Sequence, residues 1–273
     1  MKIKILIHTS KVPIIYRHRI VSLFKEALKL SDLEYKHSLY DSCVPKAFTF
    51  NLSFPQGFTI RKEPLQIDSQ FTPEKFRELQ NVETFYLPEN SFLSLWISSA
   101  DYRFIISLYN GLRNLETFRF STDDTMLVNG EKINWKIKRI APVNDRLVTK
   151  RTVTLKTCSP ILIEKNINGK KKPILFTDDN FEKELNFTMN KILSTLRGYG
   201  LREPLSFKEI KMSVQKVKHT LKEFREKTGI PFMTLTGNRG IFQLQGHPED
   251  INYIVKIGIG NRTGQGFGMV EVK

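Results

Sequence analysis

Residues 246–272 are GHPEDINYIVKIGIGNRTGQGFGMVEV, and their pattern sets the order of the last three structural elements. Pro248, followed by two acidic residues, is typical of a first helical turn, because proline needs no N–H there and acids favour the positive helix N-terminus. Residues 258–268 then hold five glycines in eleven residues. Residues 269–272 follow as a strand. The sequence therefore predicts a helix, a glycine-rich loop and a strand.

The first half of the chain also closes with a helix and then a strand. Asp101 is expected to cap a helix that runs to about Leu115, and residues 132–140 (KINWKIKRI) alternate between polar and apolar side chains as a strand does. The preceding part adds an expected strand, an amphipathic helix and two strands, at residues 2–9, 17–30, 47–54 and 91–98. This order is that of a ferredoxin-like unit.

The second half is expected to repeat that order. The predicted elements are a strand at 152–163 interrupted at Ser159–Pro160, a helix at 180–197 capped by Asp178 or Asp179, a strand at 210–221, a hairpin whose turn is residues 237–240, and the closing helix and strand. We therefore predict an α+β protein of tandem ferredoxin-like (RRM-like) domains with antiparallel sheets. The expected domains are residues 1–145 and 146–273.

Charge is the unusual quantity in the composition. The 273 residues include 43 Lys and Arg against 28 Asp and Glu, a net charge of +15, while 40% hydrophobic residues exclude a disordered chain. Residues 136–172 hold eleven basic residues against two acids, and residues 208–227 hold seven against three. Such a charge favours a polyanionic partner, either nucleic acid or an anionic membrane surface, although each run also fits a simple solvated face.

The cysteines, the paired acids and the apolar segments argue against several classes of protein. Cys43 and Cys158 lie far apart in no metal-ligand spacing, so neither a disulfide framework nor a cysteine zinc site is supported. Asp123–Asp124 and Asp178–Asp179 are typical of turns and helix caps, and no metal or cofactor is expected. The chain has no run of about 20 apolar residues and no signal-peptide pattern at its start. A cytoplasmic protein that does not span a membrane is therefore expected.

The glycine-rich loop suggests close approach to a phosphate backbone. It follows a helix, the reverse of a dinucleotide-binding motif, and it lacks the Lys–Ser/Thr ending of a Walker loop. An irregular turn remains the alternative, but it would hardly require polar side chains among so many glycines. The expected contacts are Gly260, Asn261, Arg262, Thr263 and Gln265.

These residues carry a resemblance. Residues 246–272 resemble the signature of the CRISPR-associated repeat-processing endoribonucleases of the Cas-six family, in the RAMP superfamily, and TVTLKTCSPILIE (152–164) and VPKAFTFNLSF (44–54) are similar more weakly. The resemblance implies tandem ferredoxin-like domains that bind CRISPR repeat RNA and cleave it without metal. It leaves open a homodimer and association with a CRISPR effector complex.

Metal-free RNA cleavage needs a base for the 2′-OH, an acid for the leaving oxygen and a cation for the developing charge. The resemblance implies a catalytic histidine in the loop after the first helix, a tyrosine on that helix and a lysine shortly after. Aligning on residues 45–48 puts Tyr40 in the histidine position and Lys25 in the tyrosine position. His37, with Tyr40 and Lys46, is then the predicted catalytic set, and His18 is an alternative near it.

The other histidines have simpler interpretations. His8 lies in a predicted strand, His247 at a helix start, and His219 in a lysine-rich strand where surface exposure is expected. Predicted RNA contacts outside the glycine-rich loop are Lys25, Lys36, Arg139, Arg146, Lys150, Arg151 and Arg239. The leading hypothesis is an endoribonuclease that leaves 5′-OH and 2′,3′-cyclic phosphate ends. The alternatives are a catalytically silent RNA-binding subunit and an unrelated basic RNA-binding protein.

Overall fold

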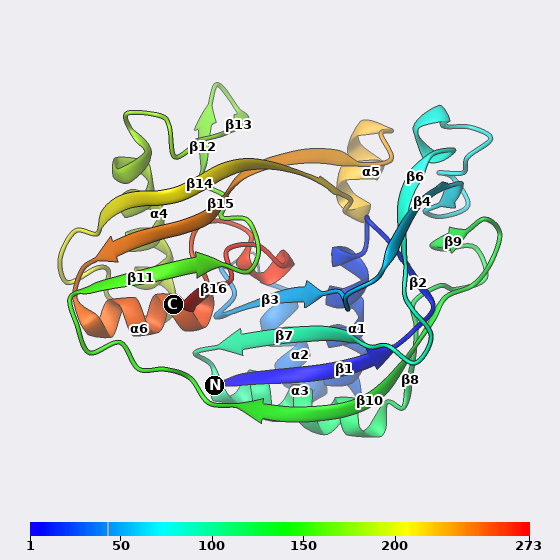
Figure 1. Ribbon diagram of the computed structural model, residues 1–273, viewed down its shortest axis with the longest axis horizontal. Coiled ribbons are helices and arrows are strands. Elements are labelled where there is room, and N and C mark those ends of the chain that lie inside the picture. The colour runs from blue at the N-terminus through cyan, green and yellow to red at the C-terminus, as the bar shows by residue number, and fades with distance from the viewer. Residues whose placement is uncertain (43) are drawn as a thin grey trace.

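The N-terminal sheet has the predicted ferredoxin-like order. The computed structural model describes residues 1–42 and 44–273, so the expectation for Cys43 lies outside the described residues. The sheet runs β3 (Phe48–Ser53), β7 (Leu93–Ser99), β1 (Lys2–His8), β10 (Asn134–Val143) and β8 (Thr117–Arg119), with antiparallel neighbours throughout. Helices α1 (Arg17–Ser31) and α3 (Tyr102–Asn114) join these strands in the expected places (Figure 1).

Alternating side chains explain how this layer forms. In β1 the isoleucines are buried while the lysines between them face outward, which gives the sheet one apolar face. Helix α1 packs Phe24 against that face, edge-to-face with Phe48 at 5.9 Å between ring centroids, and Phe104 of α3 stacks on Phe48 at 4.1 Å. The predicted cap of α3 is confirmed, since Asp101 accepts a hydrogen bond from the Phe104 N–H at 3.2 Å.

The C-terminal sheet repeats the same order. It runs β14 (Ser206–His219), β15 (Met233–Gln245), β11 (Thr152–Thr157) and β16 (Val270–Val272), with α4 (Phe181–Arg197) and α6 (Pro248–Ile257) as its two helices. A second apolar core fills the space between this sheet and its helices. Pro248 occupies the first turn of α6, as predicted. Tandem ferredoxin-like units with antiparallel sheets are therefore confirmed.

Three local predictions were wrong. Residues 237–240 do not form a hairpin turn, because β15 runs through them and pairs along its length with β14; α5 (Lys222–Thr228) lies in the connection instead. The N-cap of α4 is Asn180, and Asp178 instead accepts a hydrogen bond from the Leu175 N–H. The loop expected after the first helix, with His37 in it, contains helix α2 (Leu33–Tyr40), since Asp32 caps this helix by accepting from the Tyr35 N–H at 3.1 Å.

Smaller elements decorate the two units. β2 (Lys11–Pro13), β6 (Val82–Tyr86) and β4 (Thr59–Glu63) form a three-stranded sheet, β5 (Leu65–Gln66) pairs with β9 (Leu127–Val128), η1 (Arg77–Leu79) is a short 3-10 helix, and β12 (Glu164–Ile167) pairs with β13 (Lys170–Pro173). The last pair projects from the C-terminal unit (Figure 1). Among the described residues, none of the helices combines the length and apolar character needed to cross a membrane.

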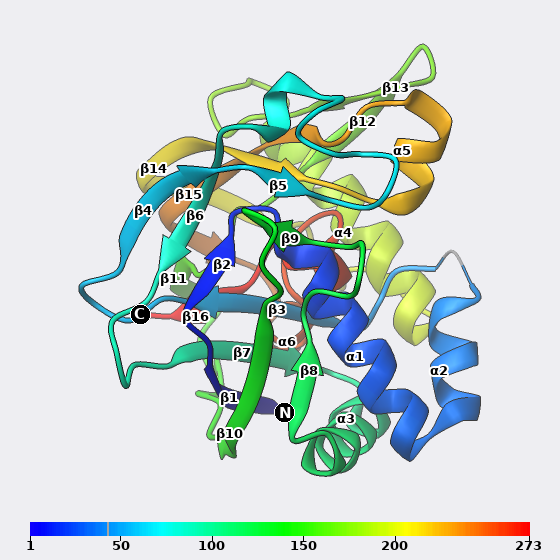
Figure 2. The same cartoon turned by 90° about the vertical axis from the view of Figure 1, so that its right-hand side faces the viewer.

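The two units share an orientation. In Figure 2, α1, α2 and α4 lie on one side of the molecule, and the strands of both sheets lie on the other. The molecule consequently has a sheet side and a helix side. The glycine-rich loop between α6 and β16 contains η2 (Thr263–Gln265), which contacts both β3 and α1 of the N-terminal unit.

Candidate nucleic-acid interface

The glycine-rich loop packs tightly against the N-terminal unit. A Cβ on Gly264 would come 2.9 Å from Cγ of Lys46, and a Cβ on Gly266, whose φ is +85°, would come 2.5 Å from the Phe50 ring. The Thr49 hydroxyl donates a hydrogen bond of 2.8 Å to the carbonyl of Phe267. Both glycines are therefore required for close contact between the two units.

Polar residues of the loop bind it to residues 162–164, the segment that leads into β12. Arg262 forms a two-pronged ion pair with Glu164, at 2.9 and 3.1 Å. Asn261 donates its backbone N–H to the Leu162 carbonyl at 2.7 Å, and its side-chain oxygen accepts from the Glu164 N–H at 2.8 Å. Gly260 has no room for a side chain, since a Cβ would lie 2.3 Å from the Leu162 carbonyl oxygen. These predicted RNA contacts thus have structural roles in the free protein.

A cavity of about 730 Å³ opens on the helix side, between α1 and α2, the glycine-rich loop and α4. We name it the helix-side cavity. Its basic lining residues are Lys25, Lys46, Lys171, Lys191, Lys222 and Arg262. Glu164 is the one acidic residue that lines it within the described part of the chain, and Glu164 is paired with Arg262. The cavity therefore attracts anions.

Three of the predicted site residues meet in this cavity. The ammonium groups of Lys25 and Lys46 lie 4.7 and 5.9 Å from the centroid of the Tyr40 ring. Lys46 also donates to the carbonyl oxygens of Leu39 and, at 2.9 Å, Ser42, which fixes its head beside α2. Burial raises the pKa of the Tyr40 phenol, so Tyr40 stays protonated at neutral pH and can donate a hydrogen bond.

His37 lies apart from this group. It sits on α2, one turn before Tyr40, with 55% of its side chain exposed and its Nδ1 3.0 Å from a carboxylate oxygen of Asp41. It does not line the helix-side cavity. The structure thus separates His37 from Lys46, although the two are close in the sequence.

Two other histidines line the cavity instead. His18 lies at the start of α1, and His219 ends β14 with only 1% of its surface exposed, so the predicted surface exposure of His219 was wrong. Burial lowers the pKa of His219 to about 3, helped by the charges of Arg17 and Arg262. Burial likewise lowers the pKa of His18 well below its usual value. Both imidazoles are therefore neutral at pH 7.

A sequence signal for His219 existed. In β14 the alternation places Val217 and His219 on the same face, and both are buried. Lys216 and Lys218 alternate with these two residues and belong to the other, more exposed face of the strand. The histidine was consequently assigned to the wrong side.

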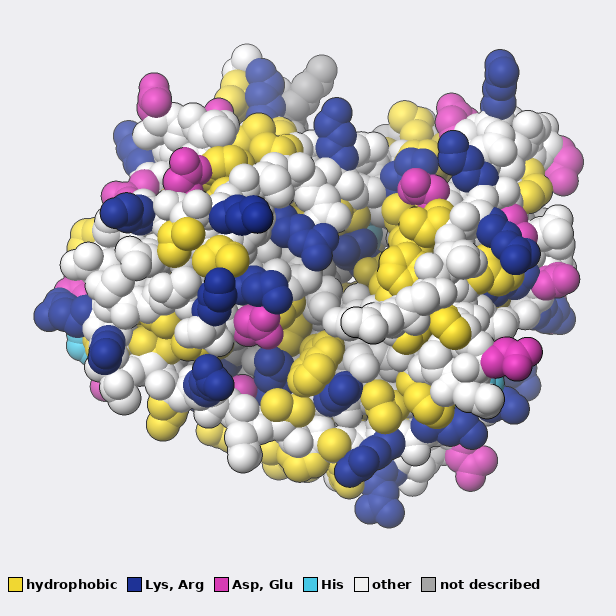
Figure 3. Space-filling model, viewed as in Figure 1, with side chains coloured by type: hydrophobic (Ala, Val, Ile, Leu, Met, Phe, Trp, Pro, Cys, Tyr) yellow, Lys and Arg dark blue, Asp and Glu magenta, His cyan; other side chains and the backbone are white. Residues whose placement is uncertain are grey.

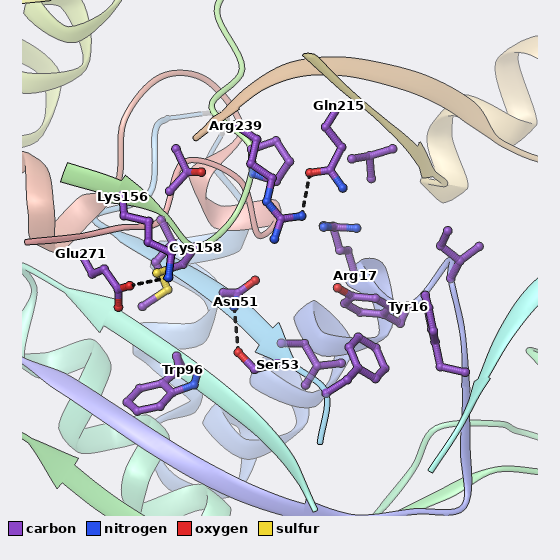
Figure 4. A pocket seen from close by; sticks show the side chains of 18 of the residues that line it. Tyr16, Arg17, Asn51, Ser53, Trp96, Lys156, Cys158, Gln215, Arg239 and Glu271 are labelled. Carbon is purple, nitrogen blue, oxygen red and sulfur yellow. Dashed lines mark hydrogen bonds and ion pairs between the residues drawn. The ribbon is translucent and has the colours of Figure 1, made fainter. Parts of the chain in front are cut away.

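The sheet side carries a second hollow, of about 650 Å³, between the two sheets. We name it the sheet-side cleft. Its basic lining residues come from both units, namely Lys2, Arg17, Lys156, Lys216 and Arg239, and Glu271 is its one acidic lining residue among those described. Figure 3 shows dark blue side chains gathered along this face. Figure 4 shows that Arg239 reaches Gln215 at 3.2 Å and that Lys156 pairs with Glu271.

Aromatic rings add to the cleft. Trp96 lines it beneath the ammonium groups of Lys2 and Lys4, which lie 5.2 and 4.8 Å from its ring centroid. Sequence reasoning missed Lys2, Lys156 and Trp96 as candidates. The signal was their place on the outward face of strands whose other face is buried.

The remaining predicted RNA contacts are scattered. Arg146 and Lys150 are exposed on the segment that connects the two units, and Arg151 forms an ion pair with Glu203. Arg139 is exposed on β10, at a shallow groove near the end of α3 and away from both hollows, and Lys36 lies half-buried on α2. The structure thus gathers Lys25, the loop residues and Arg239 at the two hollows, and it leaves the other predicted contacts outside them.

The family model described as CRISPR associated protein Cas6, C-terminal, matches residues 142–272. A search of curated proteins finds no match.

Solved structures match over the whole chain. One described as a Cas6-related gene product from Pyrococcus furiosus is 18% identical, with a TM-score of 0.72 and coverage of 100% of this chain and 98% of that one. A RAMP protein described as binding different RNA substrates is 17% identical, with a TM-score of 0.71 and coverage of 100% and 99%. At these identities the likeness shows a shared fold.

Proposed function

We propose that this chain, whose residues 142–272 match the Cas6 C-terminal family model, is a Cas6-family protein that binds CRISPR repeat RNA and cleaves precursor transcripts within each repeat. One observation carries the proposal: the glycine-rich loop of the C-terminal unit and the Lys25–Tyr40–Lys46 group of the N-terminal unit line the same basic cavity. A Cas6 product complex shares the fold, with a TM-score of 0.61 at 11% identity.

The proposed chemistry is attack of a ribose 2′-OH on the adjacent phosphate. The scissile phosphate would lie in the helix-side cavity, where the Lys46 ammonium offsets charge on the phosphorane and the protonated Tyr40 phenol donates to a phosphate oxygen. In this step the 2′-OH loses a proton and the leaving 5′-oxygen gains one. His37, exposed one turn before Tyr40 on α2, is the group proposed to take up or deliver that proton, which requires the RNA to pass over α2 as it enters the cavity. The products would be a 2′,3′-cyclic phosphate and a 5′-OH.

We propose different roles for the two units. Residues 1–145 would carry the catalytic group and residues 146–273 the RNA-binding loop. RNA leaving the helix-side cavity would continue along basic surface, including the sheet-side cleft with Arg239 and the connecting segment with Arg146 and Lys150. Association with an effector complex or with a second copy of the chain is part of this proposal, and size-exclusion chromatography with and without repeat RNA tests the latter.

Cleavage of a repeat RNA in EDTA tests the proposed activity. We expect one cut per repeat, and none when the nucleotide before the cut carries a 2′-deoxy sugar. His37→Ala should slow the cut by about 10² or more if His37 moves the proton. Cutting of the deoxy substrate would contradict the proposed chemistry, and a wild-type rate for His37→Ala would remove His37 from it.

A second candidate function is a silent RNA-binding subunit. It is favoured by the composition of the helix-side cavity: Tyr40 stands at the position where the family resemblance implies a histidine, and the two histidines of the cavity have pKa values far below neutral. Groups with such low pKa values are weak bases at pH 7. Tight repeat binding with no product over hours would establish this function.

A further inference from the structure

The helix-side cavity collects polar groups that have no partner. Seven buried side-chain nitrogen or oxygen atoms of the described residues make no hydrogen bond. Four of them belong to residues that line this one cavity, namely Nδ1 of His18, Nε2 of His219, Oε1 of Gln265 and the hydroxyl of Tyr40. Two of the four are neighbours, since the Gln265 side chain lies close enough to the His219 imidazole to oppose the lowering of its pKa, although the two side chains do not meet hydrogen-bond geometry. Buried polar atoms are almost always satisfied, so four such atoms around one hollow point to a ligand that supplies the missing bonds.

The charge of these groups indicates what kind of ligand fits. The imidazoles of His18 and His219 are neutral, because burial and the charges of Arg17, Arg19, Arg225 and Arg262 oppose their protonation. The side chain of Gln265 is neutral as well, whereas the ring of Tyr40 lies beside the ammonium groups of Lys25 and Lys46, where its hydroxyl would meet the phosphate. Neutral donors and acceptors complement an uncharged polar group, whereas a phosphate would need cations.

Four of the six described basic residues that line the cavity are lysines with exposed side chains. The other two are partly buried and engaged, Arg262 with Glu164 and Lys46 with carbonyl groups beside α2. Lys25, Lys171, Lys191 and Lys222 line the same hollow and are exposed to solvent. The cavity therefore has neutral polar groups in its buried part and ammonium groups at its solvent-exposed part. One nucleotide has the matching division, with an uncharged base that carries a hydrogen-bonding edge and a charged phosphate beside it.

We propose that the helix-side cavity holds one unpaired nucleobase of the bound RNA, whose edge hydrogen-bonds with His18, His219 and Gln265 while its phosphate lies on the surrounding lysines. The inference rests on the proposed function, and it adds a specificity site to it. The site is assembled from both units, since His18 belongs to α1, and His219 and Gln265 belong to the C-terminal unit. A base can occupy it only when the two units are packed together.

The test measures the affinity of a set of repeat RNAs, each with one abasic nucleotide, for the wild-type chain, Gln265→Leu and His219→Asn. Gln80→Leu is the matched control, because the Gln80 side chain is exposed and donates to the Pro73 carbonyl, away from both hollows. Thermal melting of each variant checks folding. Gln265 is partly exposed, so its variant is expected to fold even if His219→Asn does not.

For the wild type and Gln80→Leu, we expect one abasic position to weaken binding by about 5- to 150-fold. In Gln265→Leu and His219→Asn that penalty should shrink toward onefold, because the groups that bind the base are gone. An equal abasic penalty in all four proteins, or none at any position, would mean that the cavity holds water only and would overturn the inference. Failure of the wild type to bind the intact repeat would instead overturn the proposed function.

Discussion

The sheet-side cleft and the helix-side cavity are both basic and both lie between the two units, yet they are built differently. The cleft is lined by long side chains that stand on the outward faces of strands, such as Lys156 and Arg239. The cavity has in addition to its lysines a set of buried, neutral polar groups, which come from the glycine-rich loop, the start of α1, the end of α2 and the end of β14. The first arrangement suits binding of a phosphate backbone along its length, and the second suits fixing one nucleotide.

We therefore expect variants of the helix-side cavity to change mainly the cleavage rate, and variants of the sheet-side cleft to change mainly the affinity for RNA. Lys46→Ala should lower the single-turnover cleavage rate by about 10² or more while changing repeat affinity far less, because Lys46 would act on charge that develops only in the transition state. Quenched-flow cleavage and a binding titration measure the two quantities. Lys62→Ala, on the exposed strand β4, is the matched control. If Lys46→Ala reduced the cleavage rate and the RNA affinity by the same factor, the proposed difference between the cavity and the cleft would be wrong.

In the sheet-side cleft we expect the opposite effect, a loss of RNA affinity without a loss of cleavage rate. The double variant Lys156→Ala/Arg239→Ala should weaken repeat binding by about 10-fold and reduce the slope of log affinity against log salt by about 2, since each lost phosphate contact releases fewer counterions. The cleavage rate at saturating protein should stay near the wild-type value. A large loss of that rate would place the reacting phosphate in the cleft.

The sequence predicted the local features of these regions better than the features that depend on contacts between distant segments. The order of strands and helices followed from alternation and capping, as Ile3, Ile5 and Ile7 of β1 and the Asp101 cap show, because these patterns are local. The burial of His219 and the position of His37 outside the cavity depend on contacts between distant segments. The glycine-rich loop was recognised, but its tight packing on Lys46 and Phe50 requires knowing how the two units meet.

A smaller effect concerns the packing of the two units. Arg225 of α5, with 9% of its side chain exposed, donates to one carboxylate oxygen of Asp68 at 2.7 and 3.1 Å and to the Thr220 hydroxyl at 3.0 Å. Arg225→Gln should lower the free energy of unfolding by about 1–3 kcal/mol, because Asp68 loses its charged partner. Urea unfolding measures this change. Exposed Arg77→Gln is the control, and equal stability of both variants would contradict the role of Arg225.

The last expected effect, similar in size to that of Arg225→Gln, is a pH dependence of stability. The folded-state pKa of His219 is about 3, below its usual value near 6.5, so the unfolded chain takes up a proton in this range before the folded chain does. This group therefore destabilises the fold as pH falls from about 6.5 toward 3. Urea melts at about pH 7 and pH 4.5 should show a smaller loss for His219→Gln than for the wild type. An unchanged loss would mean that other groups set the dependence.

Photo-crosslinking of a non-cleavable repeat RNA, with 4-thiouridine placed at one position at a time, tests the division of the two regions most directly. We predict that the nucleotide next to the 2′-deoxy cut site crosslinks to peptides that contain residues 44–46 or 260–265, which line the helix-side cavity. Nucleotides farther from the cut should crosslink to strands of the sheet-side cleft, around residues 153–158 or 236–242. Crosslinks from the cut-site nucleotide to the cleft peptides alone would contradict the account.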